Sequence, residues 1–163
     1  MRFLRWLRDH LVTADAVYGL ILYSALLVVL VDDHDALETF FISSGTIVVF
    51  WAAHVYAGTI ATHRGPDGEP QSMRSAFRHT ISHVSGMLYA AVLPAIIVLL
   101  SAFGVLSIEN AVDDALDLVV LLLAVLGYFS FAQRGAKIIV RILGAIGTGL
   151  FGVLIIILNV IVH

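Results

Sequence analysis

The sequence predicts an all-α fold, a polytopic membrane helix bundle with five transmembrane helices and a short N-terminal amphipathic helix. Of the 163 residues, 60% are hydrophobic and only 13% are charged, and the mean hydropathy is +1.00. Soluble domains are about half apolar and about a quarter charged, so this composition disfavours a water-soluble fold. A chain of this length usually forms one domain, and we expect residues 1–163 to be a single transmembrane unit.

Five apolar stretches approach the roughly 20 residues that a helix needs to cross the hydrocarbon layer. They are residues 12–31, 39–62, 81–106, 115–131 and 138–162. The first is longer than the core of a signal peptide and an acidic cluster follows it, so we interpret it as a retained helix. Pro94 lies inside the third stretch, where it frees the carbonyl group of Ala90 and is expected to kink the helix.

Residues 1–11, ahead of the first stretch, combine apolar and arginine side chains. Phe3, Trp6 and Leu7 can lie on one face of a helix and Arg2 and Arg5 on another. An amphipathic helix of this kind lies in the membrane interface rather than across it. The sequence therefore predicts an interfacial helix on the inner leaflet.

The basic residues fix the predicted orientation. All nine fall on one side of the predicted bundle: Arg2, Arg5, Arg8, Arg64, Arg74, Arg78, Arg134, Lys137 and Arg141. The alternate connections, residues 32–38 and 107–114, are acidic and contain no Lys or Arg. Because basic loops stay in the cytoplasm, we expect the N-terminus inside and the C-terminus outside. The richness in Ala, Val and Leu and the short loops are typical of a small bacterial inner-membrane protein, with the lipid bilayer as its first partner.

Charge and cysteine content exclude several kinds of function. The formal net charge is −3, whereas a nucleic-acid-binding protein needs a concentrated basic surface. The chain has no cysteine, which excludes disulfides, thiolate metal sites and thiol catalysis. Any metal would be held by histidine, carboxylate or backbone oxygen.

Four ionisable residues are predicted in the cytoplasmic half of the bundle, namely Asp15, His54, His79 and His83. Each such group costs at least a few kcal/mol in the membrane and so needs a partner, a water-filled cavity or a task. His79 and His83 share one helix face, and with His54 and Asp15 they would form a ligand set that suits zinc or another divalent metal. This requires a deeper third helix or a tilted second one. Alternatively, His79 is solvated and Asp15 interacts with its own helix dipole.

Acidic residues mark the predicted outer side. Asp113, Asp114 and Asp117 stand at the start of the fourth stretch, and Asp117 lies just inside its apolar part. Such a rim concentrates cations and can form the mouth of an ion pathway, although outer loops are expected to be acidic in any case. Polar groups that could continue the pathway are Tyr18, Ser24, Ser43, Ser44, Thr46, Tyr89, Ser101 and Ser130.

Small residues recur along the fifth stretch. Gly144, Thr148 and Gly152 follow one another at intervals of four, and Gly149 runs beside them. This small-xxx-small pattern lets helix backbones approach closely. It predicts a packing surface, either within the bundle or between protomers of a homo-oligomer, for which a dimer is the first expectation.

The leading hypothesis is an ion-handling membrane protein, a channel or carrier for protons or divalent metal cations that uses the histidines and Asp15. Histidine suits this task because it can bind metal when neutral and release it when protonated. The sequence has no GxSxG or HExxH pattern, so we favour a role without catalysis. The alternatives are a haem-binding electron carrier with His54 and His83 as axial ligands, an intramembrane metal-dependent hydrolase, and a membrane assembly protein that uses the fifth helix.

Overall fold

The computed structural model of the protein describes residues 12–62 and 72–162, so the predicted amphipathic helix of residues 1–11 lies outside the described part. Regular structure within these two ranges is helical throughout, without strands. The helices are α2 (Ala14–Leu30), α3 (Ala36–Thr62), α4 (Met73–Val84), α5 (Gly86–Ala102), α6 (Ile108–Ala132) and α7 (Ile138–Val162). The predicted fold class, an all-α membrane helix bundle, is confirmed.

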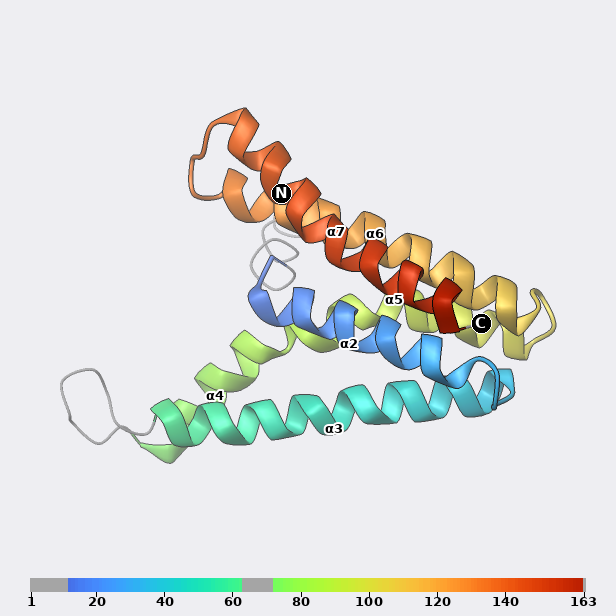
Figure 1. Ribbon diagram of the computed structural model, residues 1–163. Helices are drawn as coiled ribbons and strands as arrows, with labels where there is room; N and C mark the ends of the chain where they lie inside the picture. Colours follow the sequence, from blue (N-terminus) through green and yellow to red (C-terminus); the bar gives the residue numbers. More distant parts are fainter. Residues whose placement is uncertain (1–11, 63–71, 163) are drawn as a thin grey trace.

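The helices run up and down between two ends of the bundle (Figure 1). α6 and α7 lie side by side along one flank, α3 forms the opposite flank, and α2 and α5 lie between them. The α2–α3 and α5–α6 connections and the end of α7 lie at one end of the bundle, and the α6–α7 connection and α4 lie toward the other. Acidic and basic connections are thus separated, while the direction of insertion stays a prediction from the positive-inside rule.

In the described part of the chain, four helical spans are long and apolar enough to cross a bilayer: Ala36–Ala61, Met73–Ala102, Ile108–Ala132 and Ile138–Ile161. α2 is shorter, and its 17 residues correspond to about 25 Å of helix, against about 30 Å of hydrocarbon. α2 nevertheless packs against α3, α5, α6 and α7, and Leu20, Tyr23 and Leu27 are fully buried. Its surroundings are mainly protein rather than lipid, so it need not match the bilayer thickness by itself.

The start of α3 and the end of α5 differ from the predicted boundaries by three or four residues. Two departures are larger, and the first is the start of α6. This helix begins at Ile108 rather than at residue 115, because the hydroxyl of Ser107 accepts a hydrogen bond from the backbone N–H of Asn110 at 3.3 Å. Serine at this position satisfies one of the free N–H groups of the first turn. Asp113 and Asp114 therefore lie one turn inside the helix.

The second departure is α4, which the sequence analysis did not predict as a separate helix. The helix break lies at Ser85, between α4 and α5, whereas α5 continues through Pro94. The Ser85 hydroxyl donates to the carbonyl oxygen of Ile81 at 2.6 Å. α4 is amphipathic and buries Ala76, Thr80 and Val84. The span is therefore broken at Ser85, where α4 meets α5, and a kink at Pro94 stays a prediction.

Close packing between α6 and α7 uses the small residues predicted for this role. Gly144, Thr148, Gly149 and Gly152 all lie against α6. A Cβ atom on Gly127 would lie 2.5 Å from Thr148 Oγ1, and one on Gly152 would lie 2.9 Å from Val120 Cγ2. This surface packs within the protomer, so a homo-oligomer stays a prediction that these residues do not support.

Gly127→Leu tests this close packing. We expect it to destabilise the bundle by about 1–3 kcal/mol, because the added side chain meets the α7 backbone and Thr148 rather than a flexible group. The matched control is Gly147→Leu, since a Cβ there has no neighbour within 4 Å. This substitution raises the helix propensity by the same amount as Gly127→Leu. Thermal unfolding followed by circular dichroism in detergent measures the difference. Equal stability of the two variants would contradict the packing described.

Candidate functional site

A polar cavity of about 210 Å³ opens at the end of the bundle where α2 ends, α6 begins and α7 ends. It is lined by Val31, Asp32, Glu109, Val112, Asp113 and Asn159. Three of these residues carry a carboxylate. Grouped carboxylates beside low-dielectric walls focus a negative potential and raise the local concentration of cations. We call this space the outer acidic cavity.

Asp113 is the one predicted pathway residue that lines the outer acidic cavity. Glu109 stands one helical turn before it and shares its face, whereas Asp114 points about 100° away around the helix. Asp114 and Asp117 are exposed and are not among the lining residues. Of the three predicted pathway residues, only Asp113 thus lines this cavity, and an ion pathway stays a prediction.

Asn159 is a lining residue that the sequence analysis missed. Its Oδ1 atom is buried and has no hydrogen-bond partner, and an unsatisfied buried carbonyl oxygen is costly. A lone amide in the apolar run of α7 was the available signal in the sequence. Amide oxygens are among the groups that bind hard cations.

A cluster of three hydroxyl side chains is buried between α2 and α3. Tyr23, Thr39 and Ser43 have no exposed surface. Ser43 Oγ lies 3.1 Å from the Tyr23 hydroxyl oxygen and 2.6 Å from the carbonyl oxygen of Thr39. A serine hydroxyl has one proton, so when Ser43 gives it to the carbonyl group, Tyr23 can donate its own to Ser43. Thr39 Oγ1 is buried as well and has no hydrogen-bond partner.

His54 lies beside α2, nearer to the basic end of the bundle than the hydroxyl cluster. Its Nδ1 is 3.0 Å from the carbonyl oxygen of Phe50, and its ring centroid is 5.4 Å from that of Tyr18. A carbonyl oxygen can only accept a hydrogen bond, so Nδ1 is the donor in this contact, and in a neutral imidazole Nε2 is then the acceptor. His54 is thus oriented by its own helix, and its ring is tilted by 42° against the phenol ring of Tyr18 on the neighbouring helix.

His79 and His83 form a pair on α4, with ring centroids 4.9 Å apart. Both side chains are exposed, because α4 buries a different face, which includes Ala76 and Thr80. Asp15 is half-buried in the first turn of α2. Within residues 12–62 and 72–162, no three His, Asp or Glu side chains are gathered as metal ligands. The four-residue zinc site and the haem ligand pair therefore stay predictions without geometric support.

Comparison with protein-family models, curated proteins and solved structures found no match. Function is therefore inferred from the geometry of this chain alone.

Metal content distinguishes separate histidines from a shared site. We expect His54→Ala to leave the zinc content of the purified protein unchanged, because His54 contacts Phe50 and Tyr18 rather than the α4 pair. His83→Ala should lower any zinc that the pair on α4 retains, since two imidazoles one turn apart bind more tightly than one. Inductively coupled plasma mass spectrometry after zinc loading measures both. An equal loss of zinc in the two variants would show that the histidines share one site.

Proposed function

We propose that this protein handles cations in a bacterial inner membrane, as a channel or carrier for protons or divalent metal ions. The outer acidic cavity supports this proposal best: three residues that carry a carboxylate line one small space where three helix ends meet, although they are not close enough to share one metal ion. A site of this composition attracts cations and repels anions. Binding and release of a cation there require no covalent chemistry, which fits the absence of a nucleophile pattern in the sequence.

The α2–α3 interface supplies polar groups at two further depths. Along α2, Tyr23 lies about 10 Å from Leu30, the last residue of the helix, and Tyr18 lies about 7 Å further from it, at 1.5 Å of rise per residue. Tyr23 contacts Ser43, and Tyr18 contacts His54. In this proposal protons pass inward through the hydroxyl cluster, and His54 receives them on Nε2, because imidazole accepts and releases protons near neutral pH. Water molecules would bridge the intervals between these groups.

A homo-dimer is compatible with this role, although the small residues of α7 already pack against α6. Its contact would use the outer apolar face of α7, where Leu143, Ile146 and Leu150 are exposed. In a membrane such a face is also satisfied by lipid.

Cation flux into proteoliposomes tests the outer acidic cavity. Asp113→Asn should lower the initial rate about tenfold at low ionic strength, and less at physiological salt, where surface charge is screened. The matched control is Asp114→Asn, which removes the same charge from the adjacent position outside the cavity. Its rate should stay within about twofold of wild type. Equal rates in both variants would refute the proposed entrance.

Tyr23→Phe tests the hydroxyl cluster. Loss of the phenol proton should abolish most of the proton flux, because the bond between α2 and α3 is removed. Ser24→Ala is the control: Ser24 is equally buried, but it donates only to carbonyl oxygens of its own helix, that of Leu20 at 2.8 Å. Each substitution should cost about 1 kcal/mol of stability, so only flux, read from an internal pH dye, separates them. Unchanged flux in Tyr23→Phe would exclude this step.

A further inference from the structure

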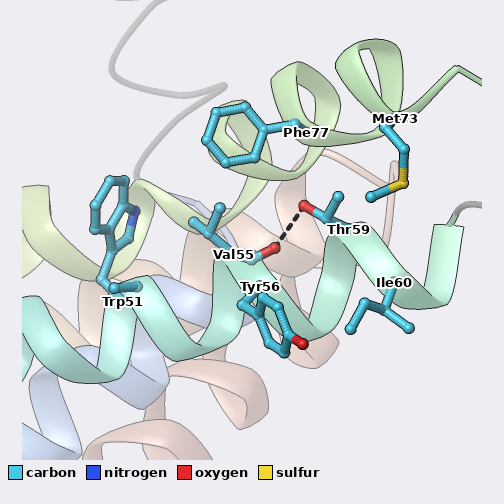
Figure 2. Close-up of a pocket in the computed structure, with 8 residues that line it drawn as sticks. Trp51, Val55, Tyr56, Thr59, Ile60, Met73 and Phe77 are labelled. Carbon is cyan, nitrogen blue, oxygen red and sulfur yellow. Dashed lines mark hydrogen bonds between the residues drawn. The ribbon is translucent and has the colours of Figure 1, made fainter.

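A second cavity, of about 340 Å³, lies between α3 and α4 at the basic end of the bundle. Figure 2 shows side chains from both helices around it: Trp51, Tyr56 and Ile60 from α3, and Met73 and Phe77 from α4. The two helices pack closely nearby, because a Cβ on Gly58 would lie 2.6 Å from Thr80 Cγ2. We call this cavity the α3–α4 groove. Its volume is within the range of small-molecule sites.

The lining of the α3–α4 groove is suited to hydrocarbon. It consists of aromatic, aliphatic and thioether groups, with few polar atoms. The hydroxyl of Thr59 donates to the carbonyl oxygen of Val55 at 2.6 Å, and this bond is drawn in Figure 2. Tyr56, Met73 and Phe77 are substantially exposed, so the groove is open at its side to the surrounding lipid. A flexible methionine and flat aromatic rings adapt to an acyl chain.

Two arginines stand beside the groove on α4. Arg74 comes directly after Met73 and Arg78 directly after Phe77, so each arginine lies about 100° around the helix from a lining residue. Residues 73 and 77 are one helical turn apart, as are residues 74 and 78, so the two arginines share one face. Both arginines are exposed, and the helix end shares its side of the bundle with Arg134 and Lys137. Guanidinium groups bind phosphate oxygens through paired hydrogen bonds. An amphipathic helix with this charge pattern sits at the headgroup level of the inner leaflet.

We propose that the α3–α4 groove binds one acyl chain of an anionic phospholipid, with the lipid phosphate held by Arg74 and Arg78. The apolar lining selects a hydrocarbon chain, and the adjacent positive charge selects a negatively charged headgroup over a zwitterionic one. The site would position α4 at the interface and fix it against α3. This inference is independent of cation handling, because no residue of the groove belongs to the outer acidic cavity or to the hydroxyl cluster.

Trp51 provides a direct test, because it lines the groove and the chain has only one other tryptophan, Trp6. In a Trp6→Phe background, the protein is reconstituted in phosphatidylcholine vesicles with increasing amounts of phosphatidylglycerol or phosphatidylcholine that carries dibrominated acyl chains. Bromine quenches indole fluorescence on contact. We expect half-maximal quenching at a mole fraction about fivefold lower for the anionic lipid than for the zwitterionic one, from the attraction of basic groups near the surface.

Three variants locate the source of the preference. Arg74→Gln with Arg78→Gln should abolish it, whereas Arg134→Gln with Lys137→Gln, which removes the same charge from the other basic connection, should preserve it. Ala52→Leu places a larger side chain at an exposed position in the lining and should reduce quenching by both lipids, with circular dichroism confirming the fold.

Three results would overturn the proposal. The first is a preference that survives in the Arg74 and Arg78 variant. The second is an equal loss of preference in the two double variants, which would indicate surface charge alone. The third is a Trp51 that neither lipid quenches while native mass spectrometry shows a dimer, because a second copy of the chain would then occupy the groove.

Discussion

Hydrocarbon offers no hydrogen-bond partner, and this constraint governs where the polar side chains of the bundle are placed. A hydroxyl in a membrane must find its partner within the protein, and the nearest is the carbonyl group three or four residues earlier in the same helix. The structure shows this bond for Ser24, Ser43, Thr46, Thr59, Ser85, Ser101, Ser130 and Thr148. A hydroxyl in a spanning segment is therefore poor evidence of function by itself. The informative groups are those that bond across helices or lack a partner.

The same constraint explains why the histidines need not meet. A buried imidazole was expected to seek other polar side chains, yet the carbonyl oxygen of Phe50 satisfies His54 within its own helix. The α4 histidines avoid the cost of burial in another way, since they are exposed on an interfacial helix. What distinguishes His54 is then its contact with Tyr18. In the proposed function, the polar route consists of side chains that contact a neighbouring helix, together with the unpartnered oxygen of Asn159.

Hydropathy and charge were sufficient to predict the fold class and the bounds of α7, because a helix exposed to lipid needs a long apolar run. They were not sufficient for α4, whose mixed composition resembles a loop until its contact with α3 through Thr80 is known. The negative charge of the outer acidic cavity could be predicted from the sequence, but the residues that line it could not. Whether Asp113 or Asp114 faces Asn159 depends on the rotation of α6 against α7, and hydropathy does not report that rotation.

That rotation is set by the small residues between α6 and α7, which connects packing to the proposed function. Gly152 rests on Val120, and Asn159 lies two turns further along α7, level with the first turns of α6. A slip of one turn would move it by about 5.4 Å and withdraw its amide from the carboxylates. The connection between the two helices limits such a slip: Gly135 has a φ of 67°, and Ala136 N–H donates to the carbonyl oxygen of Phe131 at 3.2 Å, which closes the end of α6 tightly. The composition of the cavity thus depends on backbone contacts at the opposite end of the hairpin.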